Sequence, residues 1–76
     1  MDTAAIIDRL GGTKETAEIC GVTPAAVTLW KRTGIPPSHW RAIVRYAETQ
    51  AIAGVTFDAI QDARKAAKVA IYHPPI

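Results

Sequence analysis

A chain of 76 residues with a hydrophobic fraction of 49% and a formal net charge of +2 is long enough for one small domain with a thin core. Its single cysteine excludes an internal disulfide and favours a reducing compartment. The chain has no run of about 20 apolar residues that could span a membrane, and no basic and then apolar N-terminal stretch typical of a signal peptide. We therefore expect a cytoplasmic protein without a membrane partner.

The first two predicted helices are short and end at glycines. Residues 3–10 place apolar side chains on one side of a helix, and Gly11 follows directly. The second helix is expected to start after Thr13, whose hydroxyl can cap the first turn, and to end at Gly21. A glycine at that point accepts the positive φ that a tight turn requires.

The third predicted helix has a clear start signal. Thr23 is a good N-cap, and Pro24 occupies the first helical position, where its missing N–H costs nothing. The helix is expected to run to Arg32 or Thr33 and to stop at Gly34. On a helical wheel its inward side consists of Thr23, Ala26, Val27 and Trp30.

A fourth helix is expected to begin near Ser38 and to close at Gly54. It carries the most regular amphipathic stripe in the chain, which consists of Trp40, Ile43, Val44 and Ala47. Tryptophan can also stack on a splayed nucleotide base, but Trp30 and Trp40 both fall on apolar stripes. We therefore expect both tryptophans in the core.

A fifth helix is expected over residues 56–71, capped by Thr56. Its inner line consists of Phe57, Ile60, Ala63 or Arg64, Ala67 and Ile71. Residues 72–76 contain two prolines and are expected to form an extended C-terminal tail. The predicted fold is all-α, a compact bundle of about five short helices in a single domain, residues 1–71.

Residues 13–32, TKETAEICGVTPAAVTLWKR, have the pattern of two short helices joined by a tight turn. Ala17 is small enough to lie where two steeply crossing helices approach, and Gly21 supplies the turn. Val27 gives the second helix of this pair an apolar side that faces the first helix of the pair. This pattern is typical of a DNA-binding helix-turn-helix in which residues 23–32 form the recognition helix.

The basic residues are concentrated around this motif. Residues 19–47 carry one lysine, three arginines and no acidic residue, a local charge of +4, whereas residues 1–18 have a charge of −2. A basic block of this kind is the pattern expected of a nucleic-acid-binding surface. Charge blocks also occur on merely solvated surfaces, so this feature supports DNA binding only together with the motif.

The outer side of the recognition helix is short and mostly uncharged, and it can press into a major groove about 12 Å wide. Arg32 can pair with guanine, and Thr28 can bond either class of base edge. Ala25 or Leu29 can touch the methyl group of thymine. A purely solvated side would more often carry Glu, Lys and Gln, so we favour a base-reading surface.

Other residues are candidates for contacts with DNA phosphates, which position a protein without reading sequence. They open predicted helices or flank the recognition helix, and they are Thr13, Lys14, Lys31, Ser38 and Arg41. Arg41 and Arg45 lie four residues apart on one side of a helix and repel each other. A nearby phosphate would relieve that repulsion, and so would water. We interpret the neighbouring His39 as an exposed polar residue.

Residues 11–36, GGTKETAEICGVTPAAVTLWKRTGIP, resemble the lambda-repressor/Cro-like helix-turn-helix family, and within it the small Cro-type and YdaS-type regulators of phage and prophage origin. The resemblance implies that the recognition helix enters the major groove. It also implies that the protein binds as a homodimer to two half-sites. By this resemblance the reading positions are Thr23, Pro24, Ala25, Thr28, Leu29 and Arg32.

The dimer surface is expected on the fifth helix and the tail. Small residues there allow close helix approach, and apolar residues near the end have little use in a monomer. The residues concerned are Ala59, Ala63, Ala66, Ala67, Ala70, Ile71, Tyr72 and Ile76. The alternative is that the fifth helix only covers the core.

The main functional hypothesis is a sequence-specific double-stranded DNA-binding transcription regulator, a repressor located at the nucleoid. An architectural DNA-binding protein, an antitoxin or a component of a phage switch is the first alternative. A protein-interaction adaptor that no longer binds DNA is the second. No phosphate-binding glycine loop, acid pair or nucleophile–base arrangement suggests an enzyme. Cys20, His39 and His73 lack the spacing of a zinc site, so we expect no metal, cofactor or small-molecule substrate.

Overall fold

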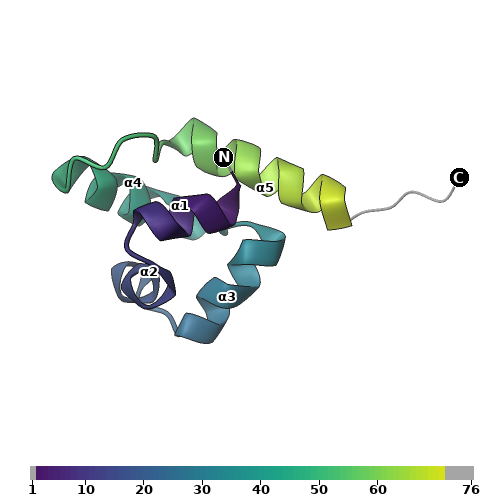
Figure 1. Ribbon diagram of the computed structural model, residues 1–76, viewed down its shortest axis with the longest axis horizontal. Coiled ribbons are helices and arrows are strands. Elements are labelled where there is room, and N and C mark those ends of the chain that lie inside the picture. The colour runs from purple at the N-terminus through teal and green to yellow at the C-terminus, as the bar shows by residue number, and fades with distance from the viewer. Residues whose placement is uncertain (1, 72–76) are drawn as a thin grey trace, which may run out of the picture.

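In a computed structural model, the described part of the chain, residues 2–71, is entirely helical in its regular elements (Figure 1). Five α-helices and one short 3₁₀-helix follow one another within this range. They are α1 (Thr3–Arg9), α2 (Thr13–Cys20), α3 (Pro24–Thr33), the 3₁₀-helix η1 (Pro37–His39), α4 (Trp40–Thr49) and α5 (Phe57–Ile71). The prediction of a compact all-α bundle of about five helices is confirmed. The predicted tail, residues 72–76, lies outside the described residues.

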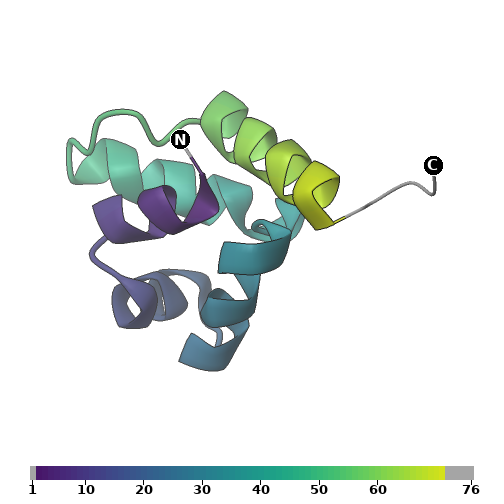
Figure 2. The ribbon, with the colours of Figure 1, turned by 45° about the vertical axis from the view of Figure 1, so that its right-hand side comes forward.

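The helices are arranged around one core. In both views α5 lies along one edge of the molecule and α2 along the opposite edge, with α1 and α4 between them (Figures 1 and 2). The helix α3 packs on α1 and α2 and also contacts α5. The buried apolar side chains form a single cluster: Ile6, Ile7, Leu10, Ala17, Val27, Trp30, Ile35, Ile43, Val44, Ala47, Val55, Ile60 and Ala63.

Side-chain caps define the starts of α1 and α5. An Asp2 Oδ1 atom accepts the Ala5 N–H at 2.8 Å and caps α1. Thr56 Oγ1 accepts the Ala59 N–H at 3.1 Å, which confirms the predicted cap of α5. These bonds satisfy backbone donors that have no partner within the helix.

The predicted cap of α2 is wrong. Thr13 is the first helical residue, and the N-cap is Gly12, which has no side chain to accept a hydrogen bond. Gly12 adopts a φ of 103°, so the chain turns into α2 one residue earlier than expected. Thr16 instead donates its hydroxyl to the Gly12 carbonyl oxygen at 2.9 Å.

The predicted limits of α4 are also wrong. Residues near Ser38 form the 3₁₀-helix, and α4 ends at Thr49 rather than near Gly54. Ala51 adopts a φ of 55°, and the Ile52 N–H donates to the Ala47 carbonyl oxygen at 2.8 Å. This is the helix-ending geometry usually associated with glycine. Here an alanine adopts it, and the following residue, Ile52, packs against the core.

The predicted inner line of α5 is only partly confirmed. Ile60 and Ala63 are buried, but the Phe57 side chain is 49% exposed. Phe57 is the first residue of α5, and it lies over a surface groove beside Val44 of α4. The helix therefore reaches the core only one turn after its start.

A close contact joins the end of α3 to α5. Gly34 is buried and has a φ of 90°, and a Cβ atom built on it would lie 2.8 Å from the Cα atom of Arg64. The next carbonyl oxygen, that of Ile35, accepts the Trp40 Nε1–H at 2.7 Å and an Arg64 Nη1–H at 3.5 Å. The exit of α3 is thus held by residues of both α4 and α5.

Candidate nucleic-acid interface

The turn between α2 and α3 has a defined hydrogen-bonding geometry. Gly21 has a φ of 68°, and its N–H donates to the Glu18 carbonyl oxygen at 3.3 Å. The Val22 N–H donates to the Ala17 carbonyl oxygen at 3.0 Å. These two bonds form a Schellman motif, which ends α2 and redirects the chain within a few residues. The glycine predicted from sequence therefore has the expected left-handed conformation.

The start of α3 follows directly. Thr23 Oγ1 accepts the Ala26 N–H at 3.3 Å, and Pro24 is the first helical residue. The prediction that Thr23 faces inward is wrong, since its side chain is exposed. As the N-cap it has extended dihedral angles (φ −82°, ψ 153°), so the helical wheel does not describe it.

The inner side of α3 packs on the core as predicted. Val27 and Trp30 are buried, and Ala17 of α2 is buried as well. The Trp30 ring also lies against the ring of His39, with centroids 5.0 Å apart and planes tilted by 35°. His39 is therefore half-buried rather than exposed. This contact attaches η1, with Ser38, to the end of α3.

The outer side of α3 is exposed along its length. Its exposed residues are Pro24, Ala25, Thr28, Leu29, Lys31 and Arg32. Leu29 is 54% exposed, so its apolar side chain is accessible to a ligand. The Thr28 hydroxyl donates to the Pro24 carbonyl oxygen at 3.1 Å. In this conformation its oxygen can accept a hydrogen bond from a base amino group but cannot donate one.

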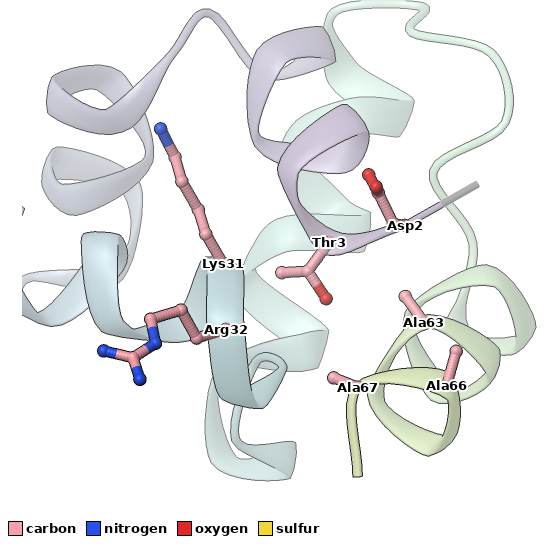
Figure 3. Close-up of a pocket in the computed structure, with 7 residues that line it drawn as sticks. All are labelled: Asp2, Thr3, Lys31, Arg32, Ala63, Ala66 and Ala67. Carbon is pink, nitrogen blue, oxygen red and sulfur yellow. The ribbon is translucent and has the colours of Figure 1, made fainter. Parts of the chain in front are cut away.

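The two cationic side chains at the end of α3, Lys31 and Arg32, are exposed. Figure 3 shows the Lys31 amino group and the Arg32 guanidinium group pointing away from the part of α5 that carries Ala63, Ala66 and Ala67. Both charged groups are therefore free to contact a ligand outside the protein.

The remaining predicted contact residues are more dispersed. Lys14 is exposed in the first turn of α2, and Thr13 beside it is half-buried. Ser38 and Arg41 are exposed on η1 and on the first turn of α4. Arg41 lines a groove of about 450 Å³ together with Val44, Arg45, Glu48 and Phe57. The structure thus groups Arg41 with the surface between α4 and α5.

Other chemistry can be assessed for the described residues. Burial raises the pKa of the Cys20 thiol above its usual range, so the thiol is protonated and weakly nucleophilic at neutral pH. Within residues 2–71 there is no group of three or more histidine, cysteine or acidic side chains that could bind a metal ion. No helix in the same range has the length and apolarity needed to cross a bilayer.

Two arginines have structural partners that the sequence does not indicate. An Arg9 Nη1–H donates to the Ala53 carbonyl oxygen at 3.2 Å, which holds the α4–α5 loop against α1. Arg64 reaches the Ile35 carbonyl oxygen. These partners are 44 and 29 residues apart in the chain, so no local pattern could reveal them.

Comparison of the chain with family models, with curated proteins and with solved structures finds no match.

Proposed function

We propose that the protein is a sequence-specific double-stranded DNA-binding transcription regulator, acting as a repressor, and that α2 and α3 form a helix-turn-helix. The observation that carries the proposal is the outer side of α3. It is exposed, contains no acidic residue, presents Leu29 to solvent and ends in two exposed cations, Lys31 and Arg32. An α-helix with such a surface fits a major groove, where it can read base edges.

Each group on this surface has a distinct role in the proposal. Arg32 pairs with the O6 and N7 atoms of a guanine, and Leu29 packs on a thymine methyl group. Thr28 accepts a hydrogen bond from a base amino group, because its hydroxyl already donates to the Pro24 carbonyl oxygen. Lys31 and Lys14 contact phosphates and fix the position of the domain on DNA.

Strong salt dependence is the first expected result. For a dimer that makes about 6–10 phosphate contacts, the DNA affinity should fall by about 10³–10⁵ between 50 and 200 mM salt. The binding site would first be selected from a random DNA pool, and affinity then measured by fluorescence anisotropy. Absence of DNA binding at low salt would falsify the proposal, and a protein-interaction adaptor would then be the better hypothesis.

The proposal includes a homodimer, because a single small domain makes few contacts and two copies can bind half-sites one DNA turn apart. The predicted dimer surface needs one correction. Ala63 is 3% exposed and packs in the protein's own core, so it is not available to a partner. Ala66 of α5 is exposed and remains a candidate, and Phe57, which was predicted to face inward, is exposed and becomes a new one. The side chains of Ala70, Ile71, Tyr72 and Ile76 lie outside the described residues.

Phe57→Ser should weaken the dimer. Phe57 and Leu29 are the two large apolar side chains identified as exposed, and the dimer proposal assigns Phe57 to the partner surface and Leu29 to DNA. Sedimentation equilibrium should show a lower dimer fraction for Phe57→Ser, because burial of an aromatic side chain contributes strongly to an interface. Leu29→Ser is the matched control, with unchanged dimerisation and weaker DNA binding. Equal dimer fractions for the two variants would place the interface elsewhere.

A further inference from the structure

A pocket of about 290 Å³ lies between the start of α1, the end of α3 and the middle of α5 (Figure 3). Three alanines of α5 form one wall, and Asp2, Thr3, Lys31 and Arg32 form the rest; the alanines are Ala63, Ala66 and Ala67. The volume lies just below the usual range for ligand pockets, about 300–1,000 Å³. A ligand of a few heavy atoms would fit it.

Thr3 gives this pocket an unusual feature. Its side chain is 2% exposed, and its Oγ1 atom is buried without a hydrogen-bond partner. Figure 3 shows this oxygen pointing toward the part of α5 that carries Ala63 and Ala67. A buried hydroxyl without a partner is unfavourable, and buried polar atoms are nearly always paired in folded proteins. A molecule that entered the pocket far enough to reach this oxygen would satisfy the donor.

The charges around the pocket indicate what kind of molecule that is. Lys31 and Arg32 contribute two positive charges on flexible, exposed side chains that can turn toward a bound anion. The carboxylate of Asp2 is held by the Ala5 N–H and points away from α5 in Figure 3. The alanine wall favours a short apolar body. The pocket thus combines two mobile cations, one hydrogen-bond donor and a small apolar surface.

We propose that this pocket binds a small organic monocarboxylate. The Thr3 hydroxyl donates to one carboxylate oxygen, Lys31 and Arg32 neutralise the charge, and the alkyl part lies on the alanines of α5. A hydrogen bond to a charged acceptor is stronger than one between neutral groups, so Thr3 should contribute strongly to affinity.

The test is an NMR titration of the full chain with sodium butyrate at constant ionic strength, with sodium chloride as the reference. A dissociation constant of about 1 mM is expected, since the ligand is small. Saturable shifts should appear at the amide signals of Thr3, Ala63, Ala66 and Ala67. Butylamine, of the same length and opposite charge, should not bind, and 2-aminobutyrate should bind more weakly because it brings a positive charge to Lys31 and Arg32. Absence of saturation with butyrate, or tighter binding of either amine, overturns the proposal.

Thr3→Val is the decisive variant, because it replaces the hydroxyl by a methyl group of nearly equal size. Butyrate affinity should fall about tenfold or more, while the melting temperature of the free protein stays the same or rises. Thr28→Val makes the same chemical change on the exposed side of α3 and should leave butyrate affinity unchanged. If Thr3→Val lowers the melting temperature and leaves butyrate affinity unchanged, the hydroxyl has a partner within the protein and the proposal is wrong. Ala67→Leu, which fills the pocket, should abolish binding.

A consequence for DNA binding rests on the proposed function. Because Lys31 and Arg32 belong to both surfaces, saturating butyrate should weaken DNA binding by the wild type more than by Thr3→Val. The titration without DNA does not depend on that function. A positive titration with no effect on DNA would refute only the shared surface, whereas a negative titration would refute the pocket.

Discussion

Gly34→Ala is expected to lower the free energy of unfolding by about 3 kcal/mol or more. Two effects add at this position. The backbone has a φ of 90°, which side chains rarely adopt, and the new Cβ atom would lie 2.8 Å from the Cα atom of Arg64. The Cα atom of Arg64 belongs to the backbone of α5, so the clash cannot be relieved by rotating a side chain. Relief requires α5 to move away from α3, which would also disturb the Arg64 bond to the Ile35 carbonyl oxygen.

Gly12→Ala provides a matched control for this prediction. Gly12 has a similar φ of 103°, but a Cβ atom built there meets nothing within 4 Å. The Gly12→Ala variant should therefore lose only the backbone contribution, about 1–3 kcal/mol of the free energy of unfolding, without the clash. Urea denaturation followed by circular dichroism measures both, and each kcal/mol corresponds to about 4–8 °C in melting temperature for a domain of this size. Equal losses for the two variants would show that α3 and α5 do not approach closely at Gly34.

Arg32→Ala is expected to weaken binding to the selected DNA site by about 1–3 kcal/mol and to relax preference at one base position. The guanidinium group forms a planar fork that matches the two acceptors of guanine, and alanine removes both bonds. Arg32 is exposed, so the variant should fold normally. The measurement compares affinities for the selected site and for versions with each base pair changed in turn.

Two further variants separate base reading from general electrostatics. Lys14→Ala should weaken binding to all sequences about equally and reduce the salt slope by about 1, as expected for a phosphate contact. Arg45→Ala removes the same charge as Arg32→Ala from an exposed arginine in the groove between α4 and α5. If Arg32→Ala and Arg45→Ala had the same effect on every sequence, α3 would not be the reading helix.

Local signals in the sequence predicted the first half of the fold well. The pair formed by Thr23 and Pro24 marks the start of α3, and Gly21 marks the turn before it; both were located correctly. Each signal acts within one helical turn, through a cap, a fixed φ or a positive φ, so distant residues do not change it. The inward positions of Val27 and Trp30 were correct for a related reason, since the period of a helix determines which residues share a side.

The candidate contact surface was predicted in part. The outer side of α3 follows from the same helical period, and its residues are exposed as expected. The position of Arg41 relative to this surface does not follow from the helical period. It depends on the orientation of α4, which η1 and the Trp30–His39 contact help to set. The orientation of a helix is decided by packing, and periodicity within the helix contains no information about it.

By itself, the sequence determined the all-α class, the order of the helices and the buried side of α3, because these depend on interactions between residues a few positions apart. Only the tertiary structure decided that α4 ends at Thr49, that Phe57 stays exposed, and that Gly34 lies against Arg64. It alone placed the hydroxyl of Thr3 without a partner beside Lys31 and Arg32. These features arise where segments distant in the chain compete for the same space, so the packing of the whole domain determines them.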